Sequence, residues 1–184
     1  MSRLPIPARD DVPEASKPIL DAVNKQLGVV PNMFRLFATS PAALTGLTSL
    51  DAANAKTLDL KTRIGIALAV AQVNRCGYCL SAHNYIGLNL AKISPDEAVL
   101  NRQGKSNDAR IGAAVRFAAK VAEARGLVGD ADLDAVRKAG FTDAQVVEIV
   151  SVTAENVLTN LINNVAQTDI DFPVISADDL KAAA

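Results

Sequence analysis

The sequence predicts an all-α protein, and three observations support that prediction. Its 184 residues are 49% hydrophobic but only 4% aromatic, with no tryptophan, which suits packed helices better than a sandwich of strands. Apolar residues recur at helical spacing along most of the chain. Proline, serine, threonine and glycine stand where helices would start or stop. We therefore expect a compact bundle of helices, with one domain over residues 1–184, because this length supports a single substantial core.

The predicted helices are delimited by capping signals. Gly28 ends the first helix, Ser40-Pro41 opens the third, and Thr142-Asp143-Ala144-Gln145 is a capping box at the start of the longest. Ser94-Pro95-Asp96-Glu97 resembles a second capping box. Irregular arms are expected at residues 1–12 and 171–184. The predicted helices are 13–27, 32–38, 41–55, 60–73, 76–92, a short helix from residue 95, 109–125, 130–138 and 143–165.

Residues 60–73 are open to two interpretations. Ile64, Ile66, Leu68 and Val70 alternate at period two, as in a buried strand. The residues between them are small, and Ala-rich runs resist strand formation, so a helix is favoured. Because apolar residues occupy nearly every face of this helix, we expect other elements to pack against all its sides, and one of them could belong to another chain.

Charge and composition exclude several classes of partner. Lys plus Arg total 19 and Asp plus Glu total 20, so the net charge of -1 creates no field that attracts nucleic acid or an anionic membrane. The apolar stretch at residues 64–73 is far short of the roughly 20 residues of a membrane span. The first residues lack the apolar core of a signal peptide, so we expect a cytoplasmic protein. In that reducing compartment, redox chemistry or metal binding explains the two cysteines better than a structural disulfide does.

The chemistry-bearing residues are concentrated in one helix. Cys76, Cys79 and His83 are spaced by three and four residues, which places them within an arc of roughly 60° on one helical face. Asn74 and Arg75 precede this helix, so both cysteines lie in or near its first turn, where the helix dipole favours a thiolate. In a Cys-x-x-Cys sequence, one thiolate can attack a substrate and the other can close a disulfide.

This arrangement predicts a thiol peroxidase mechanism. Cys79 attacks the O–O bond of a peroxide to give a sulfenic acid, and Cys76 condenses with it to form a disulfide and expel water. His83, the single histidine, lies one turn beyond Cys79 and can take the thiol proton directly or through a water. An external thiol or disulfide reductant must regenerate the pair, and no other cofactor is expected.

Other interpretations of these residues stay open. The two cysteines and the histidine could be incidental core residues, since free cysteine is often buried. They could hold zinc, but no second Cys or His completes a fourfold site, so a carboxylate or water would be needed. Tyr78 and Tyr85 are close enough in sequence to line the pocket or donate a hydrogen bond, although tyrosines beside a helix more often serve packing.

Three stretches of the chain carry a family resemblance. They are Val30-Pro31-Asn32-Met33-Phe34, then Ala67-Leu68-Ala69-Val70-Ala71 leading into Cys76-Gly77-Tyr78-Cys79-Leu80-Ser81-Ala82-His83, and Leu158-Thr159-Asn160 leading to Asp171-Phe172-Pro173. Through them the chain resembles the carboxymuconolactone decarboxylase and alkylhydroperoxidase D superfamily, in its peroxidase-related branch. The resemblance implies an alkylhydroperoxidase D-like helical fold, a homo-oligomer (dimer, trimer or hexamer), a peroxidatic Cys79, a resolving Cys76 and a place for His83 in the proton relay.

One position departs from the pattern of that redox branch. The branch carries a glutamate twelve residues before the first cysteine, and Ile64 stands there in this chain and cannot relay a proton. Glu155 lies inside an otherwise apolar helix, where a buried acid is costly unless it is paired. We hypothesise that Glu155, from the same or a neighbouring subunit, takes the place of this glutamate against His83. A cap or a salt bridge to Arg63 or Arg75 would explain Glu155 equally well.

The predicted function is therefore an antioxidant peroxidase acting on alkyl or hydrogen peroxides. A lactone decarboxylase is one alternative, in which His83 acts as acid and base and the cysteines are dispensable. A non-catalytic oligomeric redox sensor is another, in which the disulfide changes assembly.

Overall fold

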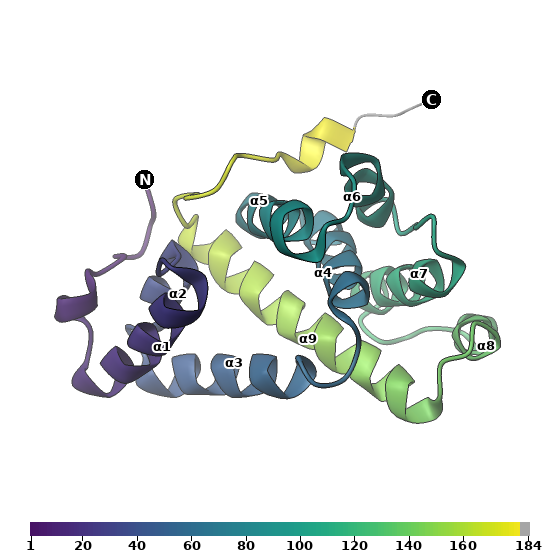
Figure 1. Cartoon of the computed structure of the whole chain (residues 1–184), viewed down its shortest axis with the longest axis horizontal. Helices are drawn as coiled ribbons and strands as arrows, with labels where there is room; N and C mark the ends of the chain where they lie inside the picture. Colours follow the sequence, from purple (N-terminus) through teal and green to yellow (C-terminus); the bar gives the residue numbers. More distant parts are fainter. Residues whose placement is uncertain (181–184) are drawn as a thin grey trace.

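The computed structural model describes residues 1–180, which form helices and, within that range, no strand (Figure 1). The all-α prediction is confirmed, and each predicted helix is present in whole or in its larger part. Residues 181–184 of the predicted C-terminal arm lie outside the described part. The helices are α1 (Lys17–Leu27), α2 (Asn32–Phe37), α3 (Pro41–Asn54), α4 (Leu60–Val73), α5 (Gly77–Ile86), α6 (Pro95–Arg102), α7 (Ala109–Glu123), α8 (Asp130–Lys138) and α9 (Asp143–Ala166).

Helix α4 lies at the centre of the fold, which confirms the helical interpretation of residues 60–73. Asp59 caps its start, where the carboxylate accepts the backbone N–H of Thr62 at 3.0 Å. Residues 64–71 are all buried, because α5, α6, α7 and α9 of the same chain pack around them. The expected wrapping is thus provided by this chain.

The contact between α4 and α7 depends on a glycine. A Cβ at Gly65 would lie 2.7 Å from Val115 Cγ2 and 3.1 Å from Asn101 Oδ1. We predict that Gly65→Ala destabilises the protein by about 1–3 kcal/mol, because the two helices must move apart. Urea denaturation measures this loss. Gly46→Ala is the matched control, since a Cβ at that position in α3 meets nothing within 4 Å and alanine favours helix by up to about 1 kcal/mol. Equal stability of the two variants would contradict the prediction.

The two predicted capping boxes have different outcomes. At the start of α9, Thr142 Oγ1 accepts the Gln145 N–H and Gln145 Oε1 accepts the Thr142 N–H, so this box is confirmed. At the start of α6, Ser94 Oγ accepts the Glu97 N–H, but the Glu97 side chain does not return to Ser94. Its carboxylate instead accepts hydrogen bonds from Asn101, Ser106 and Asn107, so the second half of that prediction is wrong.

The predicted motif helix at residues 76–92 is divided in the structure. Helix α5 ends at Ile86 and continues as a π-helical turn, η3 (Gly87–Ala91). Gly87 stands at the change, where a Cβ would lie 2.9 Å from Ile93 Cδ1 and 3.1 Å from Ile64 Cγ2. Close packing against α4 therefore accounts for the glycine, and hydrophobic spacing alone could not reveal the π turn.

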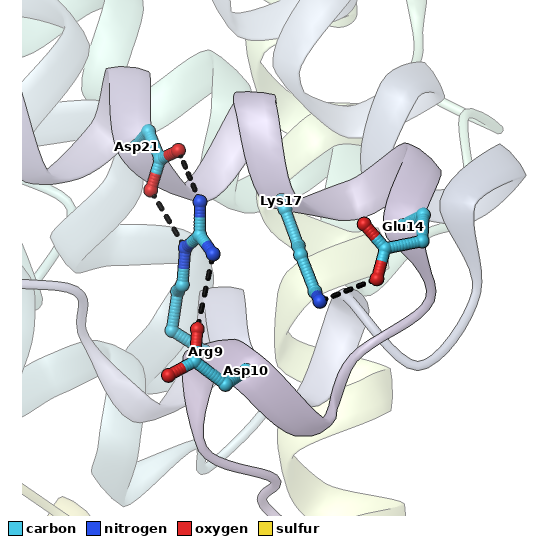
Figure 2. A network of polar contacts seen from close by, with 5 residues as sticks. All are labelled: Arg9, Asp10, Glu14, Lys17 and Asp21. Atoms are coloured by element: carbon cyan, nitrogen blue, oxygen red, sulfur yellow. Dashed lines mark hydrogen bonds and ion pairs between the residues drawn. The ribbon is translucent and has the colours of Figure 1, made fainter.

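The N-terminal arm is tied to α1 by ion pairs on the surface (Figure 2). The Arg9 guanidinium donates to both carboxylate oxygens of Asp21, at 2.9 and 2.5 Å, and also to Asp10. Lys17 donates to Glu14 at 2.5 Å, across a turn of 3-10 helix (Glu14–Ser16) that forms the first part of the helix predicted at residues 13–27. These pairs are exposed, so they position the arm and add little stability.

Helix α9 runs between α1–α3 on one side and α4–α7 on the other (Figure 1). The chain that follows it crosses the α5 side of the molecule towards α6, where the Gln72 amide donates to the Ala177 carbonyl and Arg102 donates to the Ser176 carbonyl. Among residues 1–180, no helix is both long enough and apolar enough to cross a membrane.

The outward face of α9 exposes large apolar side chains at helical spacing. They are Val147, Val150, Leu158, Leu161 and Val165. The predicted oligomer stays a prediction, and this face is where we expect a second copy to make contact.

Candidate functional site

The two cysteines lie at the start of α5, as the sequence predicts. Cys76 is the N-cap residue, and its Sγ accepts the backbone N–H of Cys79 at 3.4 Å. Both are free thiols, and they are 0% and 2% exposed. The first turn of the helix thus joins the pair and directs its N–H groups towards the sulfur of Cys76.

Helix α9 presents a buried polar face to these cysteines. Thr153, Asn156, Asn160 and Asn163 are all buried at helical spacing on the side that packs against the core. The Asn163 amide donates to Cys79 Sγ at 3.4 Å, and the Asn74 amide donates to Asn160 Oδ1 at 2.9 Å. A carboxamide donor therefore reaches the sulfur of Cys79 from the opposite side of the site.

These contacts make the two thiols unequal. The pKa of Cys79 is lowered because the Cys76 thiol donates a hydrogen bond to it, and because Asn163, Asn160 and Thr159 add to that effect. The pKa of Cys76 is raised by the same hydrogen bond and by burial. The structure therefore favours a thiolate on Cys79 and a protonated thiol on Cys76.

His83 lies on α5, one turn beyond Cys79, and is held in its neutral form. Burial lowers its pKa to about 4, and a hydrogen bond to Asn156 opposes this shift only in part. Its Nδ1 is buried and has no hydrogen-bond partner among residues 1–180. No hydrogen bond joins His83 to either cysteine in that range, so proton transfer from Cys79 requires an intervening group or a small movement.

Within this chain, Glu155 is not a partner of His83, contrary to our hypothesis for a single subunit. Its carboxylate accepts a hydrogen bond from the Asn54 amide of α3 at 2.6 Å, while Asp51 and Arg63 are its charged neighbours. The adjacent residue, Asn156, is the one that meets His83, because successive residues of a helix point about 100° apart. Ile64 is buried in the same apolar cluster as Cys79.

The position of Glu155 leads to a prediction about stability. Burial and nearby Asp51 raise the pKa of Glu155 to about 7, while an unfolded glutamate titrates near about 4.3. As the pH rises, the Glu155 carboxyl therefore ionises in the unfolded chain before it ionises in the folded protein. The resulting loss of folding stability is absent below about pH 4 and complete above about pH 7. We predict that Glu155→Gln gains roughly 1–2 kcal/mol at pH 8, because its partly exposed carboxylate is also screened by water, and gains nothing at pH 4.

Denaturant titrations at the two pH values measure this difference. Glu148→Gln is the matched control, because it removes a carboxylate of α9 that makes no hydrogen bond to Asn54 within residues 1–180. A gain for Glu155→Gln that is the same at both pH values would contradict the assignment.

Tyr78 serves packing and anchors the segment that covers the motif. Its hydroxyl donates to Asp171 at 2.8 Å and accepts the Met33 N–H at 3.0 Å, and its ring meets Phe172 edge to face. Tyr85 also packs on Phe172. The backbone N–H of Ile175 donates to Ser81 Oγ at 2.9 Å. The C-terminal arm is therefore fixed over α5, which accounts for the complete burial of Cys76.

The residues that the sequence interpretation missed are the asparagines of α9. Their signal was available, because Asn156, Asn160 and Asn163 are polar residues repeated at spacings of four and three on the core side of an otherwise apolar helix. As for metals, no group of three or more His, Cys, Asp or Glu side chains within residues 1–180 is arranged to hold an ion.

Comparison with known proteins shows one family match and several similar structures. The model of the Carboxymuconolactone decarboxylase family matches residues 39–124, which include α4 and the whole Cys-x-x-Cys motif. The chain is 29% identical to an uncharacterised peroxidase-related protein from Ralstonia eutropha JMP134, described as an alkylhydroperoxidase AhpD core, over 92% of each chain with a TM-score of 0.82. The family match and this likeness of sequence and fold support the resemblance to the carboxymuconolactone decarboxylase and alkylhydroperoxidase D superfamily.

Two further solved structures share this fold. A peroxidase-related protein from Silicibacter sp. TM1040 is 26% identical over 91% of each chain, with a TM-score of 0.79. A variant of the debrominase Bmp8 in complex with 2,3,4-tribromopyrrole is 17% identical, covers 93% of this chain and 94% of its own, and has a TM-score of 0.78, which is a likeness of fold. No curated protein matches the sequence.

Proposed function

We propose that this protein is a thiol peroxidase that reduces alkyl or hydrogen peroxides through Cys79 and Cys76. The observation that carries the proposal is the contact of the Asn163 amide with Cys79 Sγ at 3.4 Å, beside a second cysteine in the same helical turn. Cys79 has a lowered pKa and an amide donor at its sulfur, while the neighbouring Cys76 keeps its proton. A peroxidatic cysteine must be a thiolate, and a resolving cysteine beside it must wait as a thiol.

The proposed reaction has two steps on the enzyme. The Cys79 thiolate attacks the terminal oxygen of the peroxide, so an S–O bond forms, the O–O bond breaks, and the proton released by Cys79 ends on the alcohol or water that leaves. Cys76 then attacks the sulfenic sulfur, which forms the disulfide and expels water. An external dithiol then reduces the disulfide, which restores both thiols, and is itself oxidised to a disulfide.

His83 has a limited place in this proposal. With its pKa lowered to about 4, the imidazole is neutral at physiological pH and can accept a proton, but it is a weak base. The same property disfavours the lactone decarboxylase alternative, which needs His83 as an effective base and makes no use of the unequal cysteines.

Turnover measurements test the function. Purified protein with dithiothreitol should consume hydrogen peroxide and cumene hydroperoxide faster than dithiothreitol alone, because the thiolate of Cys79 is the better nucleophile at neutral pH. A rate equal to that of the reductant alone with both peroxides would contradict the proposal. Unchanged carboxymuconolactone decarboxylation by a Cys79→Ala variant would favour the alternative.

A further inference from the structure

The two sulfurs of the proposed active site are covered by different parts of the chain. Cys79 Sγ lies against α9, from which a side-chain amide donates to it at 3.4 Å. Cys76 is 0% exposed and lies at the start of α5, where residues 171–180 of the C-terminal arm cross the molecule (Figure 1). Beside Cys76, a Cβ at Gly77 would lie 3.8 Å from the carbonyl oxygen of Ile175. A different element must therefore move before a large molecule can reach each sulfur.

The two covers differ in how firmly they are held. Helix α9 is 24 residues long, and its buried side packs on α3, α4, α5 and α7. None of residues 171–180 is buried, although the apolar side chains among them pack on the cluster that contains both cysteines. A segment with few buried apolar contacts opens locally at a lower free energy than a core helix does. The C-terminal arm is therefore the cover that can be removed.

Hydrogen bonds to the backbone of the arm hold it in place. The Arg102 guanidinium of α6 donates to the Ser176 carbonyl at 2.7 Å and to Gln72 Oε1 at 3.0 Å. The Gln72 amide donates in turn to the Ala177 carbonyl at 2.9 Å. Arg102 is only 7% exposed, but both of these acceptors are uncharged oxygens. When the arm moves away, water replaces the lost carbonyl, so opening does not leave a buried cation unpaired.

The chemistry of disulfide reduction favours attack at the sulfur beneath the arm. A thiolate that attacks one sulfur of a disulfide releases the other as a thiolate, and the thiol with the lower pKa leaves faster. The pKa of Cys79 is lowered by the Cys76 thiol and by the Asn163 amide, and the amide is still present when the two cysteines are joined. Attack at Cys76 thus releases the more stable thiolate.

We propose that the external dithiol reduces the oxidised protein by attacking Cys76 Sγ, after the C-terminal arm has moved away from α5. The inference rests on the proposed peroxidase function and assigns the reductive half of its cycle. A thiolate of the reductant bonds to Cys76 Sγ, the Cys76–Cys79 bond breaks, and its electron pair stays on Cys79. The second thiol of the reductant then displaces Cys76, which takes up the released proton, and the reductant leaves as a disulfide. Arg102 is a positioning residue, since it holds the arm closed.

A monothiol identifies the sulfur that is attacked. The disulfide is first formed with diamide, so that the test does not depend on peroxide turnover, and is then treated with a limited amount of glutathione. Acid stops the exchange, N-ethylmaleimide labels the cysteine that was released, and tandem mass spectrometry locates both adducts. We expect glutathione on Cys76 and the maleimide on Cys79. The reverse arrangement would overturn the inference.

Loosening the arm should accelerate reduction by dithiothreitol. In Arg102→Met the charged donor to the Ser176 carbonyl is lost, so we expect about 10-fold faster reduction of the disulfide formed with diamide. Arg110→Met is the matched control and should keep the wild-type rate, since its guanidinium lies 4.1 Å from the centre of the Phe141 ring. Hydrogen–deuterium exchange of α9 should be unchanged in Arg102→Met, which separates local opening of the arm from global unfolding.

A shortened chain tests the arm without changing α6. A protein that ends at Val174 lacks the carbonyls that accept from Arg102 and Gln72 but keeps the contact of Asp171 with Tyr78. We expect its disulfide to be reduced at least as fast as that of Arg102→Met, and it provides the test if Arg102→Met does not fold. Reduction of the shortened chain at the wild-type rate would overturn the role of the arm.

The outcomes separate this inference from the proposed function. If peroxide oxidises the two cysteines but glutathione is found on Cys79, the inference fails and the peroxidase function stands. If peroxide leaves both thiols free but glutathione adds to Cys76 of the diamide-treated protein, the peroxidase function fails and the site of attack stands.

Discussion

Replacing Cys79 with serine is expected to lower peroxide turnover by more than about 1000-fold, because a serine hydroxyl does not ionise near neutral pH and cannot replace the thiolate. Replacing Cys76 with serine should abolish multiple turnover but leave the first chemical step. The Cys79 sulfenic acid would then persist, since no resolving thiol stands beside it. Trapping with dimedone followed by peptide mass spectrometry measures this species.

The two variants differ little in their expected folding. Serine is a good N-cap residue, so at position 76 its hydroxyl can still accept the Cys79 N–H that Cys76 Sγ accepts now. Circular dichroism of both proteins provides the control. A dimedone adduct on Cys76 of Cys79→Ser, with none on Cys79 of Cys76→Ser, would reverse the assigned roles.

Replacing Asn163 with leucine should raise the pKa of the Cys79 thiol by about one to two pH units. A hydrogen bond to a charged group contributes about 1.5–3 kcal/mol, and the Asn163 amide is the side chain on α9 that donates to this sulfur at 3.4 Å. Because the hydrogen bond favours the thiolate, its loss should decrease the thiolate fraction, and hence the rate of alkylation by iodoacetamide, at neutral pH.

The pH dependence of that alkylation rate is the measurement. Asn164→Leu is the matched control, because the Asn164 amide donates to the Asn74 carbonyl instead of to sulfur. If Asn163→Leu and Asn164→Leu titrate as the wild type does, the Asn163 carboxamide does not set the thiol pKa, and the Cys76 thiol with the other α9 side chains must account for it.

Local sequence signals were sufficient to predict most of the fold. The caps at Ser40 and Thr142 and the glycine stop at Gly28 act within one turn of the chain, so spacing and residue type reveal the helices that they bound. The π turn at residues 87–91 was not predictable in this way, because hydrophobic spacing does not distinguish it from an α-helix, and the close packing of Gly87 on Ile64 is a tertiary contact.

The same distinction between local signals and tertiary contacts applies to the candidate site. Cys76, Cys79 and His83 share one helix, so their spacing places them together without tertiary information. The α9 asparagines contribute through the packing of α9 on α5. Their spacing was visible in the sequence, but the sequence interpretation assigned the inward position to Glu155 instead of Asn156. Glu155 contacts Asn54 and Asn156 contacts His83, because adjacent residues of a helix point about 100° apart.

The proposed mechanism depends most directly on whether peroxide oxidises Cys76 and Cys79 to a disulfide. The deciding measurement is the free thiol content of the reduced wild-type protein after addition of stoichiometric hydrogen peroxide, with peptide mass spectrometry to locate any bond. The account predicts that both thiols disappear and that one peptide carries a disulfide between Cys76 and Cys79. Two thiols that stay free and unmodified after this treatment would contradict it.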